Sequence, residues 1–256
     1  MSKRKKFLIT SALLASGFVG INFLDNEVRF WAIGGLTILT IVLFYWSLAE
    51  GLALDATLLT LVLPALFTLG VGIFWFLLPA TIFARIPVVA LYGLGIYALG
   101  LTLNIYTVSA IRTIALSRAA KGVGFVLTLF TAFLLFDALF SLKTQIWIFA
   151  PAIVTTSFPL FLQGFWSTRL TKEIEKKLLF YSLISGLLIG EIGLMLYFWP
   201  VTIVVGSLFL TIGVYILLGL GQASLEGRLF TQTVRDYLTV GLLVFLSMLI
   251  VTRWAG

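Results

Sequence analysis

Residues 122–142 read GVGFVLTLFTAFLLFDALFSL, a continuous apolar run in which Asp137 is the only charged residue. A helix that crosses a membrane needs about 20 mainly apolar residues. Basic residues flank the run, with Lys121 before it and Lys143 after it, as expected where a helix leaves the hydrocarbon for the lipid headgroups. The run therefore predicts a transmembrane α-helix.

The same pattern recurs along the chain and predicts about nine spans. They cover residues 7–24, 28–48, 56–78, 86–107, 122–142, 146–165, 178–198, 201–220 and 237–252. Strands are excluded because the apolar runs are too long and lack the period-two alternation of a membrane β-barrel. We therefore predict an all-α fold, a polytopic helical bundle in which residues 1–256 form a single transmembrane domain.

The composition supports a membrane protein and excludes several kinds of chemistry. Hydrophobic residues make up 61% of the chain and charged residues only 11%, whereas soluble domains are about half apolar and a quarter charged. The mean hydropathy is +1.15. The chain contains no His and no Cys, which excludes disulfides, thiol nucleophiles and histidine ligands. The net charge of +7 is interpreted as membrane topology and affinity for anionic lipid, with no nucleic acid as a partner.

The distribution of Lys and Arg predicts the orientation. With a cytoplasmic N-terminus and alternating spans, thirteen cations fall on the cytoplasmic side: Lys3, Arg4, Lys5, Lys6, Arg112, Arg118, Lys121, Arg169, Lys172, Lys176, Lys177, Arg228 and Arg235. Only four fall outside: Arg29, Arg85, Lys143 and Arg253. This bias follows the positive-inside rule and predicts an external C-terminus. The seven tryptophans all fall near predicted span ends, where indole rings prefer to lie.

Two acidic residues within spans form a candidate polar site. Asp137 and Glu191 lie about 7–8 Å and 10 Å from the predicted outer ends of their helices. Ionised carboxylates at such depths are unfavourable and usually face a cavity or a partner. Three interpretations remain open: a cation or proton site, an ion pair with Arg85 or Arg29, and neutral carboxyl groups hydrogen-bonded to other helices.

Two cytoplasmic loops are candidate contacts for anionic lipid. Residues 109–121 predict either a short interfacial helix or a plain topology-setting loop, and residues 168–177 predict a solvated helix with a Glu173–Lys177 pair. The cations of these loops are Arg112, Arg118, Lys121, Arg169, Lys172, Lys176 and Lys177.

Small residues at four-residue spacing are candidate helix-packing surfaces. Ala12, Ser16 and Gly20 form one such stripe, and Gly186 and Gly190 form another. Small residues let helix backbones approach closely in lipid. Packing within one bundle is the simpler explanation, and contact with other membrane protein subunits is the alternative.

No recognised motif predicts an enzyme, a metal site or a cofactor. The sequence has no phosphate-binding loop, dinucleotide fingerprint, HExxH motif or serine nucleophile elbow. It also lacks an aspartate cluster that would hold Mg²⁺ and a diphosphate. These absences weigh against an enzyme.

Residues 104–125, NIYTVSAIRTIALSRAAKGVGF, and residues 128–137, TLFTAFLLFD, resemble an uncharacterised family of bacterial polytopic membrane proteins. The family is a domain of unknown function associated with small-genome candidate-phylum bacteria. The resemblance implies a prokaryotic cytoplasmic membrane and brings no activity with it.

The sequence therefore predicts a multi-pass protein of the bacterial inner membrane. We expect a non-enzymatic scaffold or subunit that contacts membrane lipids, including anionic lipid. A transporter of small solutes or ions that uses Asp137 and Glu191 is the alternative, and an enzyme acting on lipids or polyprenyl phosphates is the third.

Overall fold

A computed structural model describes residues 2–21, 23–52, 55–77, 82–110, 116–171 and 173–252, apart from the side chains of residues 26, 27, 50, 55, 56 and 82–84. Within these ranges the secondary structure is entirely helical, which confirms the all-α prediction. The α-helices are α1 (Lys3–Ile21), α2 (Asn26–Leu48), α3 (Val62–Leu77), α4 (Ile82–Ser109), α5 (Ser117–Ser141), α6 (Ile146–Arg169), α7 (Lys176–Tyr197), α8 (Ile203–Leu225) and α9 (Thr231–Val251). Two short 3₁₀-helices, η1 (Ala49–Gly51) and η2 (Asp55–Leu61), lie between α2 and α3.

Helices α2 to α9 provide eight segments of the described chain that are long and apolar enough to cross a membrane, and the segment of α3 begins in η2, at Thr57. Helix α1 falls short by this measure because its 19 residues include Lys3, Arg4, Lys5 and Lys6. The protein is thus a polytopic membrane protein, while a ninth span and the orientation of the bundle remain predictions. The bounds of the helices follow the apolar runs, because a backbone segment inside lipid must hydrogen-bond its own N–H and C=O groups, which a helix does.

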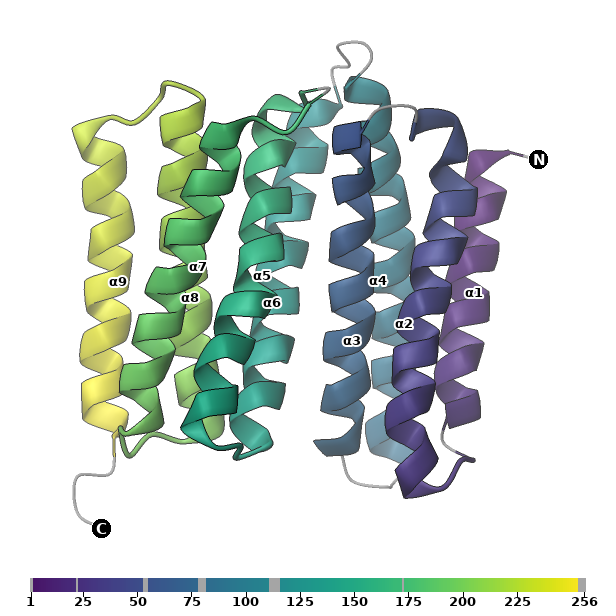
Figure 1. The fold of residues 1–256 in the computed structure, drawn as a ribbon, viewed down its shortest axis with the longest axis horizontal. Helices are drawn as coiled ribbons and strands as arrows, with labels where there is room; N and C mark the ends of the chain where they lie inside the picture. Colours follow the sequence, from purple (N-terminus) through teal and green to yellow (C-terminus); the bar gives the residue numbers. More distant parts are fainter. Residues whose placement is uncertain are drawn as a thin grey trace. The chain divides into compact units, whose positions relative to one another are not determined.

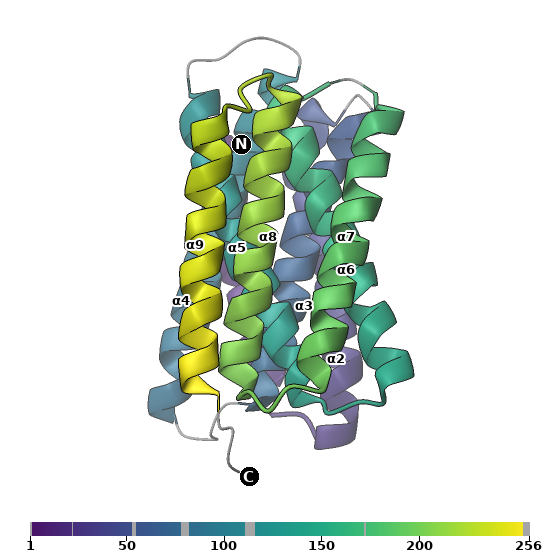
Figure 2. The same cartoon turned by 90° about the vertical axis from the view of Figure 1, so that its left-hand side faces the viewer.

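The contacts along the chain group the residues into two compact units. Unit 1 contains residues 1–131 and 170–173, and unit 2 contains residues 132–169 and 174–256. Helix α5 is one continuous helix that contributes its first half to unit 1 and its second half to unit 2 (Figure 1). In unit 2, α8 and α9 lie side by side, as the turned view in Figure 2 shows.

A chain of buried hydroxyl groups joins three helices of unit 1. Tyr92 Oη lies 3.0 Å from Thr68 Oγ1, which lies 3.0 Å from Thr40 Oγ1. Thr40 donates its own proton to the carbonyl of Leu36 at 2.8 Å. Because each hydroxyl has one proton, the donation runs from Tyr92 on α4 to Thr68 on α3 and then to Thr40 on α2. Polar side chains thereby join these helices where apolar contacts alone would leave their faces free to slide.

The glycines of α7 pack inside unit 2. A methyl group added at Gly186 would lie 3.4 Å from the backbone nitrogen of Phe158 on α6, and one at Gly190 would meet Val154 on α6. The GxxxG stripe therefore lets the backbones of α6 and α7 approach closely. By contrast, Ala12, Ser16 and Gly20 lie exposed along α1.

The expected helix over residues 168–177 is not formed. Helix α6 ends at Arg169, and Leu170 has a φ of 52°, a left-handed conformation that a continuing helix does not use. Helix α7 begins only at Lys176, so Glu173 and Lys177 do not share a helical face. In the other loop, residues 117–121 belong to the start of α5, and residues 111–115 lie outside the described residues.

The tryptophans divide into exposed and buried groups. Trp31 and Trp147 are more than four-fifths exposed at the first turns of α2 and α6, where headgroup contact is expected. Trp75 and Trp166 are almost completely buried within the protein, and the depth of the tryptophans in the membrane remains a prediction. The two buried rings contribute apolar area to the protein core. Trp254 lies outside the described residues.

We expect Thr68→Val to destabilise the protein by about 1–3 kcal/mol, because the buried Tyr92 hydroxyl would lose its acceptor. Thr37→Val is the matched control, since the Thr37 hydroxyl donates within α2, to the Ile33 carbonyl. Thermal unfolding in detergent compares the two variants. Equal melting temperatures for both would contradict a role for the hydroxyl chain.

Candidate functional site

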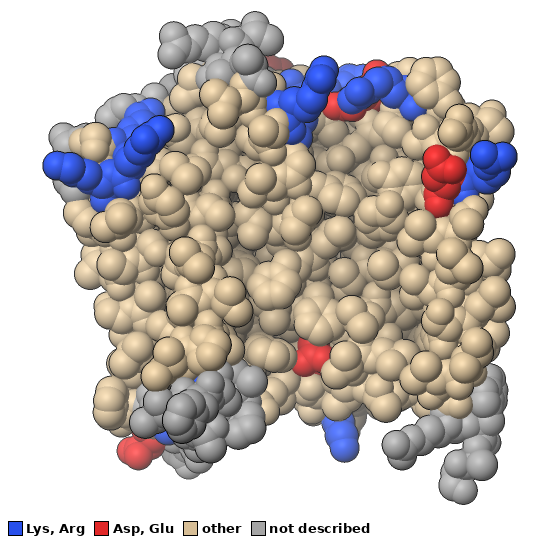
Figure 3. Space-filling view, turned by 180° about the vertical axis from the view of Figure 1, so that it is seen from behind, with Lys and Arg blue, Asp and Glu red and all other residues tan. Residues whose placement is uncertain are grey.

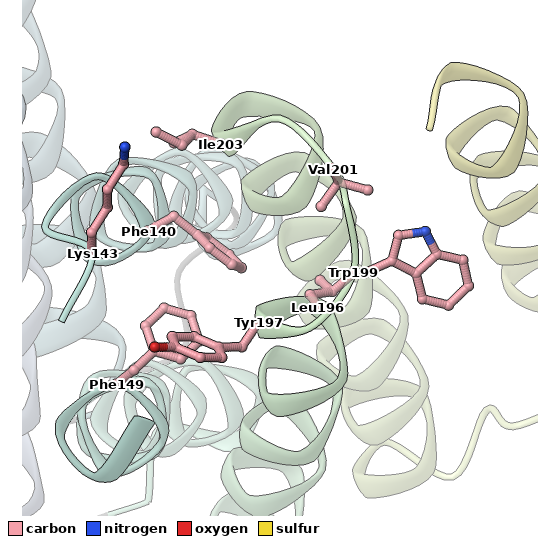
Figure 4. A pocket seen from close by; sticks show the side chains of 8 residues that line it. All are labelled: Phe140, Lys143, Phe149, Leu196, Tyr197, Trp199, Val201 and Ile203. Atoms are coloured by element: carbon pink, nitrogen blue, oxygen red, sulfur yellow. The ribbon is translucent and has the colours of Figure 1, made fainter. Parts of the chain in front are cut away.

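Unit 2 has a cavity of about 300 Å³ at the end where α5 and α7 finish. The turns after these helices form its rim. Lys143, with a φ of 46°, reverses the chain between α5 and α6. Figure 4 shows the eight lining residues: Phe140, Lys143, Phe149, Leu196, Tyr197, Trp199, Val201 and Ile203. By the predicted orientation the cavity opens on the outer side of the membrane.

Aromatic rings form much of the cavity wall. The centroids of Phe140 and Phe149 are 4.9 Å apart, and those of Phe149 and Tyr197 are 5.2 Å apart. The Tyr197 hydroxyl donates to the Thr144 carbonyl at 3.2 Å, which fixes this ring. The indole of Trp199 points away from the other rings and donates to Thr252 Oγ1 at 3.2 Å (Figure 4).

Asp137 lies one helical turn below this cavity. It precedes Phe140 by three residues on α5, and its side chain interacts with Ser207, which follows Ile203 by four residues on α8. Asp137 is only 5% exposed, and its Oδ1 atom has no hydrogen-bond partner. Ser207 is completely buried and donates to the Ile203 carbonyl at 2.7 Å. The site thus combines a buried carboxyl group, one oxygen atom of which has no hydrogen bond, with a hydroxyl group that donates to a backbone carbonyl.

Glu191 has different surroundings although it lies at a similar predicted depth. It is exposed on α7, whereas the neighbouring Gly190 and Gly193 face α6. No hydrogen bond joins Glu191 to Asp137 among the described residues. The two carboxyl groups therefore present one candidate site inside unit 2 and a second one on its surface.

Arg29 and Arg85 both lie in unit 1, so their pairing with either carboxyl group remains a prediction. Arg29 donates through Nε to the Leu24 carbonyl at 2.7 Å. The Arg85 guanidinium lies 5.2 Å from the centroid of the Trp75 ring. Both side chains thus have interactions within their own unit.

The basic residues gather at one end of each unit. Figure 3 shows Lys and Arg at the ends of the helices and a belt between them that is almost free of charge. Of the predicted lipid contacts, Arg118, Lys176 and Lys177 are exposed and Lys121 is half-buried. Arg112 and Lys172 lie outside the described residues.

Arg169 has a structural role that the sequence did not reveal. Its Nε and Nη2 atoms donate to the carbonyl of Leu225 at 3.1 and 2.8 Å, and Nη1 lies 3.3 Å from Glu175 Oε2. Leu225 is the last residue of α8, so its carbonyl lacks an intrahelical donor. A cation at a helix C-terminus is also favoured by the helix dipole. Arg169 therefore joins α6 to the end of α8.

The comparisons with known proteins identify a family. The profile of a protein of unknown function, DUF5656, matches residues 10–251. The chain belongs to the DUF5656 family. This confirms the resemblance to a domain of unknown function and extends it over nearly the whole chain. No curated protein and no solved structure matches the chain.

Sequence reasoning missed the cavity of this DUF5656 protein and the bonds of Arg169. The cavity residues come from four helix ends and the turns between them, and the only signal was a gathering of aromatic residues near Asp137. The Oδ1 atom of Asn104 and the Oε1 atom of Gln163 are also buried, and neither has a hydrogen bond.

We expect Arg169→Gln to lower the melting temperature of the protein in detergent, because the Leu225 carbonyl would lose two donors. The loss is about 1 kcal/mol or slightly more, since the donor is charged but partly exposed. Lys176→Gln removes an exposed charge nearby and should leave the melting temperature unchanged. An equal decrease in melting temperature for both variants would show that the loss of positive charge, and not the loss of the Arg169 hydrogen bonds, lowers the stability.

Proposed function

We propose that this protein is a non-enzymatic subunit of the bacterial inner membrane that associates with a second copy of itself through α7. The observation that carries the proposal is the exposure of Glu191 within a helix that is otherwise apolar in its middle. Glu191 lies six residues before the end of α7 at Tyr197, which is about 9 Å along the helix axis. A carboxyl group that faces lipid at this depth is unfavourable, and a hydrogen-bonding partner stabilises it.

The surroundings of Glu191 have the spacing of a helix-pairing surface. Phe180, Ile184, Leu187, Glu191 and Leu194 are exposed and alternate steps of four and three residues. We refer to these five residues as the α7 seam. A repeat of 3.5 residues keeps one face of a helix against a partner helix. The glycine stripe of the same helix already packs on α6, so the seam is the face that remains for a partner.

A second copy is the occupant that the α7 seam fits best. In a twofold dimer the same residue of each copy meets at the axis, which brings the two Glu191 side chains to the same depth. One protonated carboxyl group can then donate to the other, and such bonds between membrane helices contribute about 0.6–1.7 kcal/mol. The exposed stripe of Ala12, Ser16 and Gly20 on α1 is the competing surface, but it lacks a group that requires a partner.

We expect Glu191→Leu to weaken dimerisation about three- to twenty-fold, whereas Glu191→Gln keeps a hydrogen-bonding side chain and should retain most of it. Because the natural chain has no Cys, Leu187→Cys can report the contact by disulfide formation in membranes. Leu13→Cys, exposed on α1, is the matched control.

Three results would contradict the α7 dimer. One is a monomeric protein in membranes, and another is equal cross-linking through Leu13→Cys. The third is a dimer that is lost with Ser16→Leu and kept with Glu191→Leu, which would assign the contact to α1 instead.

The same protein is proposed to retain anionic lipid at its basic ends, and a groove in unit 1 supports this role. The groove has a volume of about 350 Å³ and is lined by Arg4, Lys5, Leu8, Ile9 and Tyr97. Two cations at its mouth suit a headgroup phosphate, and the apolar residues beside them suit the start of an acyl chain. The loop cations Arg112, Arg118, Lys121, Lys172, Lys176 and Lys177 complete the proposed lipid-contacting set.

We expect the double variant Arg4→Gln and Lys5→Gln to copurify with several-fold less phosphatidylglycerol or cardiolipin, because each cation contributes about 1 kcal/mol near an anionic surface. Zwitterionic lipid should be unchanged. Lipid mass spectrometry measures both classes. The double variant Arg228→Gln and Arg235→Gln removes equal charge elsewhere, and an equal loss there would contradict a specific groove.

A further inference from the structure

We infer that the cavity of unit 2 belongs to a binding site for a small organic ammonium ion, with Asp137 as the counter-ion. This inference is independent of the dimer proposed above, because it uses the interior of unit 2 and the dimer uses the exposed side of α7. Three features carry it: the aromatic cavity, the partnerless carboxyl oxygen below it, and the Phe140 ring one helical turn above that oxygen.

The cavity walls suit an organic cation better than a hydrated inorganic ion. Phe140, Phe149 and Tyr197 present neighbouring rings, and aromatic faces attract alkylammonium groups through their quadrupoles. The cavity volume of about 300 Å³ is that of a small-ligand pocket. Lys143 is the charged residue at the rim, and its side chain extends away from the aromatic rings (Figure 4).

The floor below the cavity offers two acceptors to an ammonium group. Asp137 Oδ1 is buried without a donor. Ser207 donates its hydroxyl proton to the Ile203 carbonyl, so its Oγ atom can accept a hydrogen bond from a ligand. An ammonium group has several N–H donors and satisfies both atoms, whereas Mg²⁺ or Ca²⁺ needs six or more oxygen ligands. The described residues contain no cluster of acidic side chains that would supply them.

Phe140 lines the cavity and follows Asp137 by three residues on α5, which is about one helical turn. A methyl group added at Gly206, the residue before Ser207, would lie 3.3 Å from Phe140 Cζ. The ring thus lies across the gap between α5 and α8, one turn above the carboxyl group. Contact between the charged end of a ligand and Asp137 requires this ring to turn aside, and Phe140 is only partly buried. The apolar part of the ligand then remains against Phe149 and Tyr197.

The test measures binding of benzylammonium to the purified full-length protein in a neutral detergent, by calorimetry and by the shift in melting temperature. We expect saturable binding that benzyl alcohol and Na⁺ do not reproduce. Asp137→Asn should weaken it at least about tenfold, since a hydrogen bond to a charged group is lost. Ser207→Ala should weaken it less, and Glu191→Gln should leave it unchanged.

Binding is compared only for variants whose melting temperature without ligand equals that of the natural protein. Where Asp137→Asn does not fold, Ser207→Ala and Phe149→Leu test the floor and the wall separately, and each should weaken binding. Benzyl alcohol binding as tightly as benzylammonium would reduce the site to an apolar pocket. Unchanged affinity in Asp137→Asn, or equal competition by Na⁺, would also overturn the inference.

Discussion

In a membrane, polar groups must find hydrogen bonds within the protein, and this requirement governs the structure at every level. The backbone meets it by forming helices. Many Ser and Thr side chains meet it by donating to the carbonyl four residues earlier, as Thr40, Thr128 and Ser182 do. Asp137 and Glu191 have no such local solution, because a carboxylate cannot donate to a carbonyl. The proposed functions begin at these two residues.

The two units use different physical means to hold their helices together. In unit 1, Thr68 lies between Tyr92 and Thr40, so three helices share one directed chain of hydrogen bonds. In unit 2, Gly186 and Gly190 bring α7 against α6, and dispersion forces act over a close contact. Arg169 adds a polar bond at the end of α8, where the carbonyl of Leu225 needs a donor. Polar contacts thus lie in the core of unit 1, and in unit 2 they include Arg169 and Gln222 near the end of α8 and Tyr197 and Trp199 near its beginning.

The sequence predicted the spans well, because the length of an apolar run directly determines where a helix can cross. It could not predict which face of a helix is buried, since nearly every face is apolar. Trp75 and Trp166 illustrate this limit: their positions near predicted span ends do not indicate whether they face lipid or protein, and both are buried within the protein. The end of α6 was missed for another reason. Leu170 adopts a left-handed conformation that neither its own type nor its neighbours signal.

Asp137 and Glu191 show how packing separates residues that the sequence makes equivalent. Counting along each helix gives similar depths, but Asp137 points to Ser207 inside unit 2 and Glu191 is exposed on α7. The short Asp side chain keeps its carboxyl group close to α5, within unit 2. The longer Glu side chain is exposed on α7. Because the chain has no His or Cys, its carboxyl groups are the side chains best suited to proton exchange within the spans, and we propose ligand binding for one and association for the other.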